Sequence, residues 1–244
     1  MIRPRKPGWT ENKKPIREQE LLERLIEGRL GAKVACIGAF GSPFKDPTPA
    51  FLAERLPSES VTVVDYQDAG HKYNLESKRV LGEELSKDER RELAVMKQSR
   101  RIDQRKGFYT SGGVSGYNID MQAMGLKSQV TPHIGLAWKT GLKEKQTHIL
   151  DRGTLSGFVK KQGDGRLSDT LKHYLDLVPR DGVVTLLSGL SGGDAEIEEE
   201  LRKLINEGKV HVAEHEVSDR DFSLGSNNFE AQHRMKTAYI ITKL

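Results

Sequence analysis

Two residues with the chemistry of nucleoside binding end consecutive apolar runs of the sequence. Gly38 ends the run Lys33-Val-Ala-Cys-Ile-Gly38, and Asp65 ends the run Ser60-Val-Thr-Val-Val-Asp65. A glycine directly after a strand tolerates a positive φ and lets the backbone approach a ligand closely. An acid at the tip of the next strand can accept hydrogen bonds from both hydroxyls of a ribose. The pair therefore predicts a site for a nucleoside-containing cofactor, although either residue alone is ordinary turn chemistry.

Gly38 and Asp65 belong to one predicted βαβ unit. Both runs are short and apolar, and the second is rich in β-branched residues, as buried strands are. Residues 49–56 between them suit a short helix, with Pro47 and Pro49 near its start. Because such a crossover joins parallel strands, Gly38 and Asp65 are expected at the same edge of a parallel sheet.

Alternation of strands and helices resumes after residue 128. Ser168 and Asp194 are expected to cap two helices in this region. No helical pattern separates the last two strands, so they are expected to pair as an antiparallel hairpin with a long loop. The predicted fold class is α/β, with a Rossmann-like, mostly parallel sheet of seven strands. The strands predicted in this region are 133–138, 147–151, 182–188, 210–213 and 237–242.

The region between residues 68 and 127 interrupts this alternation. It is polar and charged, and only one helix is clearly indicated, from a capping box of Ser86 and Glu89 to about residue 102. A glycine-rich loop with three aromatic residues follows at 107–118. The chain is thus expected to have four parts, which are a flexible basic arm (1–17), the first part of an α/β core (18–67), an insertion or lid (68–127) and the second part of the core (128–244).

Positive charge is concentrated in two clusters. The net charge of +4 and the pI near 9.0 are below those of a dedicated nucleic-acid binder. Such clusters neutralise phosphates, so RNA is a candidate partner. A basic tail and a solvated helix face are the ordinary alternatives. One cluster is the arm at 1–17, and the other, called here the Lys97–Lys106 cluster, is Lys97, Arg100, Arg101, Arg105 and Lys106.

Composition excludes several classes of site. No stretch approaches the roughly 18 continuous apolar residues of a membrane helix, and the polar N-terminus lacks the apolar centre of a secretory signal. Cys36 is the only cysteine, so no intrachain disulfide can form, and a reducing, cytoplasmic location is expected. No spacing among the histidines, the acids and Cys36 predicts a metal site. A phosphate-binding Gly-Lys-Ser/Thr loop is also absent from the sequence.

Three segments resemble motifs of the class I S-adenosylmethionine-dependent methyltransferases. The family's glycine motif is similar to Val34-Ala-Cys-Ile-Gly38, its acidic motif to Val61-Thr-Val-Val-Asp65, and its fourth-strand motif to His148-Ile-Leu-Asp-Arg-Gly-Thr-Leu155. The fourth-strand motif is the most specific of the three. The order of elements at the end of the chain is also similar to the family's seven-stranded sheet with its reversed final strand. The resemblance covers about residues 33–67 and 129–244.

The resemblance implies a cofactor and the residues that hold it. The cofactor would be S-adenosylmethionine. Gly38, with the neighbouring backbone of Ala39 and Gly41, would approach its methionine moiety. Asp65 would hold its ribose. Trp138 stands near the place where the family often has an acid that touches adenine, and it would stack on the adenine instead.

The resemblance also implies methyl transfer to an acceptor beside the cofactor. Asp151 would face both cofactor and acceptor, and would orient the acceptor as the catalytic residue. Arg152 and Tyr109 would contact the acceptor. The alternatives are that Arg152 is an ordinary surface residue and that Tyr109 packs inside the protein. The acceptor would be RNA or a small molecule enclosed by the 107–118 loop. Because methyl transfer from a sulfonium is an in-line displacement, alignment and exclusion of water matter more than a general base.

Two positions depart from the family pattern. Cys36 stands where the family usually has an acid, and Phe40 where it usually has a second glycine. A non-catalytic RNA-binding or scaffold protein on a decayed methyltransferase fold is therefore a second hypothesis. A nicotinamide-dependent oxidoreductase is a third, since Asp65 would serve its ribose equally well. Against the third, the Gly-x-Gly-x-x-Gly motif of such enzymes is missing after the first predicted strand.

Overall fold

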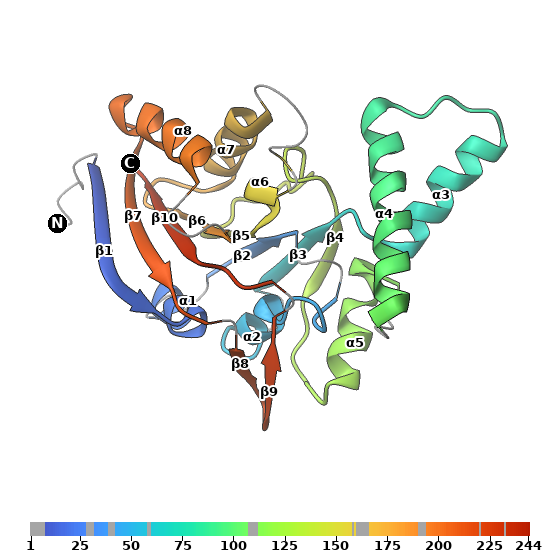
Figure 1. Cartoon of the computed structure of the whole chain (residues 1–244), viewed down its shortest axis with the longest axis horizontal. Coiled ribbons are helices and arrows are strands. Elements are labelled where there is room, and N and C mark those ends of the chain that lie inside the picture. Colours follow the sequence, from blue (N-terminus) through green and yellow to red (C-terminus); the bar gives the residue numbers. More distant parts are fainter. Residues whose placement is uncertain are drawn as a thin grey trace.

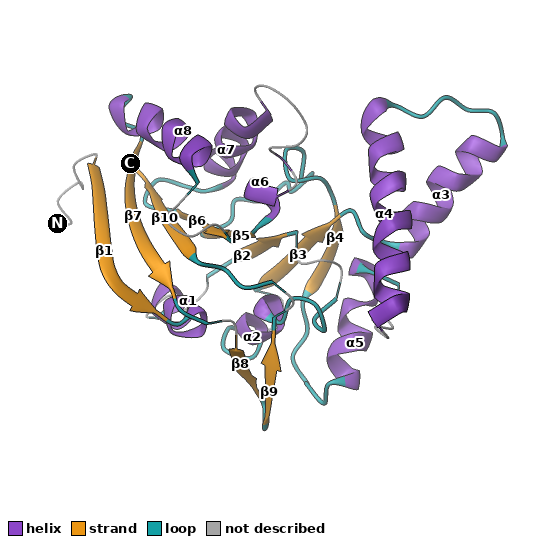
Figure 2. Cartoon of the chain, viewed as in Figure 1, coloured by secondary structure: helices purple, strands orange, loops and turns teal. Residues whose placement is uncertain are grey.

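A sheet of eight strands runs through the molecule, with helices on both faces (Figures 1 and 2). The structure is a computed structural model of the chain. It describes residues 8–27, 32–38, 42–57, 60–106, 112–157, 159, 166–189, 194–219, 221–231 and 233–244, and within 60–106 it describes side chains as far as Lys97.

The sheet is parallel except at one strand. Its strands are β1 (Gly8–Ile16), β2 (Val34–Ile37), β3 (Val61–Asp65), β4 (Thr131–Ile134), β5 (His148–Arg152), β6 (Val183–Ser188), β7 (Val210–Val217) and β10 (Thr237–Lys243). They are ordered β1-β7-β10-β6-β5-β2-β3-β4. Only β10 runs antiparallel to its neighbours, β6 and β7. The predicted α/β class and mostly parallel sheet are therefore confirmed.

Two hydrophobic cores fill the space between the sheet and its helices. The helices on one face are α1 (Glu18–Ile26) and α2 (Thr48–Ala53), and those on the other face are α7 (Arg166–Leu177) and α8 (Ala195–Asn206). Along β2, Val34 and Cys36 enter the first core, whereas Ala35 and Ile37 enter the second, as alternate strand residues must. All four residues are buried, which explains why this strand reads as a continuous apolar run.

The first strand corrects two expectations, the flexible arm over 1–17 and the sheet of seven strands. β1 pairs in parallel with β7 at the edge of the sheet. Trp9 anchors it, because the indole Nε1 donates to Glu214 and the ring packs edge-on against Tyr239. The strand is polar and exposed along much of its length, so no strand pattern is visible in the sequence. Residues 1–7 of the predicted arm lie outside the described residues.

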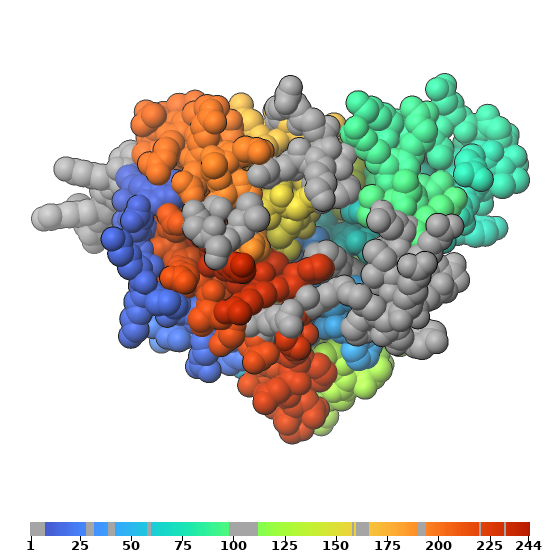
Figure 3. All heavy atoms as spheres, in the orientation of Figure 1, coloured from blue at the N-terminus to red at the C-terminus, as the bar shows by residue number. Residues whose placement is uncertain are grey.

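A helical insertion separates β3 from β4. Its elements are α3 (Ala69–Val80), α4 (Lys87–Lys106), the short 3-10 helix η1 (Val114–Gly116) and α5 (Tyr117–Ala123). The predicted capping box is confirmed, because Glu89 N–H donates to Ser86 Oγ and Ser86 N–H donates back to Glu89 Oε2. Helices α3 and α4 project from one side of the molecule, opposite β1 (Figure 3). No helix in the described part of the chain is both long and apolar enough to cross a membrane.

In the second part of the core, the predicted pairing of the last two strands is confirmed, and two other expectations are corrected. β7 and β10 pair antiparallel as expected, and the long loop between them forms a small hairpin of β8 (Asp221–Leu224) and β9 (Asn227–Glu230). Asp194 caps α8, as predicted, by accepting from Ile197 N–H. Ser168 does not cap a helix, because α7 already begins at Arg166. β4 ends at Ile134, so Trp138 lies in the loop after it and not in a strand.

Candidate functional site

The carboxyl ends of β2, β3 and β5 lie side by side at one edge of the sheet. Ile37, the last residue of β2, pairs with Val64 on one side and with Asp151 on the other. Gly38 and Asp65 therefore follow directly at the same edge, as predicted. The order of the strands reverses between β2 and β5, because the chain continues from β2 toward β4 and later from β5 toward β6. In open α/β sheets, ligands bind in the crevice at such a reversal.

Gly38 is required by the packing of this edge. Its φ is +74°, and its N–H donates to Val64 O at 2.9 Å. A Cβ at this position would lie 1.6 Å from Thr154 Oγ1, so only glycine fits against the turn that follows β5. The Thr154 hydroxyl in turn donates to Ile37 O at 3.3 Å. Ala39 and Gly41, the other predicted contacts of this turn, lie outside the described residues.

Asp65 is held at the edge by its own turn. Its carboxylate is buried, and Oδ1 accepts the N–H of Gln67 at 2.8 Å. Its backbone carbonyl accepts the N–H of Gly135, which ties the end of β3 to the loop after β4. The carboxylate thus has a defined position beside Gly38, and its role in holding a ribose stays a prediction.

Asp151 caps α6 (Thr154–Gly157), the short helix that follows β5. Its Oδ1 accepts from the backbone N–H groups of Thr154 at 2.8 Å and Leu155 at 3.1 Å. Its Oδ2 accepts from the Tyr174 hydroxyl of α7 at 2.7 Å. Burial raises the pKa of Asp151 to about 6, against the opposing effect of these hydrogen bonds. Asp151 therefore holds Thr154 in place against Gly38.

The pH dependence of stability tests this buried state of Asp151. Since its pKa rises from 3.8 to about 6 on folding, the native state binds the proton more tightly than the unfolded chain does. The contribution of Asp151 to stability is therefore present at low pH and lost as the pH rises through about 6. We expect the free energy of unfolding of the wild type, relative to Asp151→Asn, to fall by about 2–3 kcal/mol between about pH 4 and about pH 7 in urea titrations. Parallel pH profiles of the two proteins would contradict this assignment.

Arg152 lies inside the protein and not at its surface, and its contact with the acceptor stays a prediction. Its side chain is 2% exposed, and its Nε and Nη2 donate to the two carboxylate oxygens of Glu18 at 2.6 and 3.0 Å. Asp46 Oδ1 lies 3.7 Å from Arg152 Nε, and the carbonyl of His233 accepts a further hydrogen bond from Arg152 Nη2. The guanidinium thus joins three chain segments inside the protein. Tyr109, the other predicted acceptor contact, lies outside the described residues.

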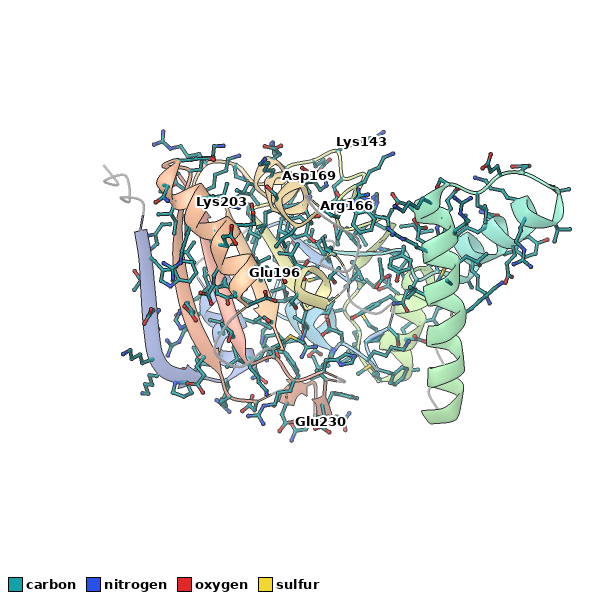
Figure 4. All side chains as sticks on the ribbon, turned by 45° about the horizontal axis from the view of Figure 1, so that its top comes forward. Lys143, Arg166, Asp169, Glu196, Lys203 and Glu230 are labelled. Atoms are coloured by element: carbon teal, nitrogen blue, oxygen red, sulfur yellow. The ribbon has the colours of Figure 1, made fainter. Side chains whose placement is uncertain are left out.

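Trp138 lies in the loop between β4 and β5 and packs against the core under α7. The guanidinium of Arg166 lies 4.6 Å from the centroid of its ring. Figure 4 shows Arg166 between α7 and the insertion, and its Nη2 is 3.9 Å from Asp88 of α4. One face of the indole is therefore covered by a cation. Adenine stacking on Trp138 stays a prediction that requires the opposite face or a displaced Arg166.

A metal site is not indicated among the side chains that the structure describes, where no group of three or more His, Cys, Asp or Glu residues gathers. The chemistry at this edge consists of a glycine turn, the carboxylate of Asp65 and backbone groups of the turns that follow the strands. Such an edge can bind and orient an organic ligand.

Solved structures share the architecture of this chain. No protein-family model and no curated protein matches its sequence. A structure described as "Conversion of a Disulfide Bond into a Thioacetal Group during Echinomycin Biosynthesis" is 16% identical, with a TM-score of 0.50 over 94% of this chain and 82% of that one. An O-methyltransferase from Bacillus cereus in complex with SAH is 11% identical, with a TM-score of 0.49 over 93% and 80% of the two chains. Precorrin 8w decarboxylase of Methanobacterium thermoautotrophicum is 17% identical, with a TM-score of 0.48 over 95% and 92%.

These likenesses concern the fold alone, since all three identities are low. β2 to β7 and β10 form a seven-stranded unit in which the final strand, β10, is reversed and lies between β6 and β7. This is the arrangement that the sequence resemblance implied. The chain thus has an α/β fold with a Rossmann-like, mostly parallel sheet, and it shares this fold with the structure from echinomycin biosynthesis.

Proposed function

We propose that this protein is an S-adenosylmethionine-dependent methyltransferase. The observation that carries the proposal is the placement of Gly38 and the buried carboxylate of Asp65 on adjacent strand ends, where the strand order of this fold reverses. A cytoplasmic location, which the single buried cysteine Cys36 favours, is part of the same proposal.

The chemistry of the residues at this edge supports the proposed cofactor. The Asp65 carboxylate would accept the ribose hydroxyls, the backbone at Gly38, Ala39 and Gly41 would meet the methionine moiety, and Trp138 would face the adenine. When bound, the cofactor supplies an electrophilic methyl group on a sulfonium. The protein would align donor and acceptor and exclude water. Asp151 would help this alignment indirectly, because it holds Thr154 at the start of α6 against Gly38.

The acceptor is proposed as one of the two classes that the sequence suggests. RNA would be contacted through the Lys97–Lys106 cluster of α4 and the basic residues before β1, whereas a small molecule would be enclosed by the 107–118 loop. Salt-dependent RNA binding that is lost when residues 1–7 are removed and the basic residues of the Lys97–Lys106 cluster are replaced would favour RNA.

One observation favours an alternative, a non-catalytic protein on a decayed methyltransferase fold. The Thr154 hydroxyl packs into the space beside Gly38, at the strand end where a cofactor would approach. Together with Cys36 and Phe40 at two motif positions, this contact would suit a turn that no longer binds a ligand. Cofactor binding separates the two hypotheses.

Replacement of Asp65 tests the proposed ribose contact. We expect Asp65→Asn to weaken binding of S-adenosylhomocysteine by about 1–3 kcal/mol, roughly 5- to 150-fold in Kd, because the amide removes the charge and one acceptor. The asparagine oxygen can still accept from Gln67, so the turn is retained. The measurement is isothermal titration calorimetry.

Asp194→Asn is the matched control. Asp194 is also a buried acid at the carboxyl edge, but it caps α8 after β6, away from β2 and β3. Asparagine is an equally good cap, so Kd is expected to stay within about twofold of the wild type. Equal effects of the two replacements would mean that Asp65 does not hold the ribose.

A further inference from the structure

The end of the insertion is bonded to the loop that follows β3. Val114 N–H donates to the carbonyl of Gln67 at 2.9 Å, and Ser115 N–H donates to Asp68 Oδ2 at 3.1 Å. The two backbones approach so closely that a Cβ on Gly113 would lie 2.1 Å from Gln67 O. The segment that closes the insertion therefore fixes the turn directly after Asp65.

The same part of the insertion is bonded to the loop that follows Gly38. Ser42 Oγ donates to Asp120 Oδ2 at 2.9 Å, and the Tyr117 hydroxyl donates to the carbonyl of Asp46 at 2.9 Å. Ser42 and Tyr117 are fully buried, and Asp120 is 2% exposed. Buried polar groups of this kind keep their partners in native structures. Helix α5 and the loop at 42–46 must therefore move together or lose these bonds.

The loop at 42–46 in turn sets the start of α2. The carbonyl of Ser42 accepts from the N–H groups of Lys45 and Asp46, and Asp46 Oδ1 accepts from Thr48 N–H, at the first residue of the helix. Thus a continuous set of buried bonds runs from α5 through the loop after Gly38 to α2.

From these contacts we infer that Tyr117 and Asp120 are positioning residues for the cofactor site, a role that rests on the proposed function. They hold the loop after Gly38, while residues 112–115 hold the loop after Asp65. The insertion is therefore part of the cofactor site as well as a neighbour of the acceptor. Because coupling between two sites is reciprocal, a displacement of the insertion weakens cofactor binding, and bound cofactor stabilises the insertion.

The test compares variants of three neighbouring residues of α5. Tyr117→Phe and Asp120→Ala remove the bonds to the loop, and Asp120→Asn restores an acceptor for Ser42. Asn118→Ala is the control, because Asn118 bonds only to the backbone of Val130 among its described hydrogen bonds. It weakens the packing of α5 without touching the loops after β2 and β3.

Two readouts are measured on each full-length variant. Without ligand, amide exchange at Lys45, Asp46 and Thr48 is expected to be about tenfold faster in Tyr117→Phe and Asp120→Ala than in Asn118→Ala. With S-adenosylhomocysteine, the calorimetric Kd is expected to rise at least fivefold in these two variants, to stay within twofold in Asn118→Ala, and to be largely restored in Asp120→Asn.

Failure of this inference is distinguishable from failure of the proposed function. If the wild type binds S-adenosylhomocysteine and Tyr117→Phe, Asp120→Ala and Asn118→Ala all share its Kd, or all weaken binding equally, the positioning role is overturned. If the wild type does not bind, the proposed function fails. Exchange at 42–48 then still decides whether α5 holds this loop, and equal exchange in Tyr117→Phe and Asn118→Ala overturns the structural coupling as well.

Discussion

Replacing Glu18 with alanine is expected to lower the free energy of unfolding by about 3–5 kcal/mol, because it leaves the guanidinium of Arg152 buried without its main partner. The pair is almost fully inaccessible, with 2% of the Arg152 side chain and none of the Glu18 side chain exposed. Asp46 Oδ1 lies 3.7 Å from Arg152 and offsets only part of the loss. The measurement is equilibrium unfolding in urea, with the midpoint and slope compared with those of the wild type.

Two further variants show whether the buried charge causes the loss. Glu20→Ala, in the same helix, removes an exposed pair with Arg24 and is expected to change stability by less than about 1 kcal/mol. The double variant Glu18→Leu/Arg152→Met removes both buried charges and is expected to recover most of the stability lost in Glu18→Ala. A Glu18→Ala protein no less stable than Glu20→Ala would contradict the role assigned to this pair.

Replacing Gly38 with alanine is expected to lower the free energy of unfolding by about 3 kcal/mol. About 1–2 kcal/mol comes from the left-handed backbone, whose φ is +74°. About 1–3 kcal/mol more comes from the clash of the new Cβ with Thr154, whose Oγ1 lies 1.6 Å and Cβ 2.8 Å from its ideal position. Thermal and urea unfolding measure the total.

Gly82 provides a control for the backbone contribution alone. Its φ is +78°, but a Cβ there would meet nothing within 4 Å, so Gly82→Ala is expected to lose only about 1–2 kcal/mol. Adding Thr154→Gly to Gly38→Ala removes the clashing side chain. In a double-mutant cycle, the double variant is therefore expected to lose less stability than the sum of the losses of the two single variants. If Gly38→Ala and Gly82→Ala lose the same stability, Thr154 is not packed against Gly38.

The parallel core was predictable because buried strands leave a clear pattern in the sequence. β2, β3 and β6 are covered on both faces, so nearly every residue in them is apolar or β-branched. The positions of Gly38 and Asp65 followed from that pattern, since the ends of adjacent parallel strands meet at one edge. The antiparallel pairing of β7 and β10 followed from the lack of a helix between them.

The side-chain environment of the site was not predictable in the same way. The ion pair of Glu18 and Arg152 joins residues 134 positions apart, and no periodicity signals such a contact. Arginine side chains are mostly exposed in proteins, so the sequence alone does not indicate that Arg152 is buried. β1 was not predicted because most of its residues are polar and exposed, and its apolar anchors are only Trp9 and the buried Ile16 at its end. The contact of Thr154 with Gly38 likewise depends on tertiary packing.

Binding of the cofactor tests most directly whether the edge formed by Gly38 and Asp65 holds S-adenosylmethionine. Purified full-length protein is titrated by calorimetry with S-adenosylmethionine, S-adenosylhomocysteine and NAD. We expect saturable binding of both methionine derivatives and no comparable binding of NAD. Absence of binding of either methionine derivative to folded protein at millimolar concentration would contradict it.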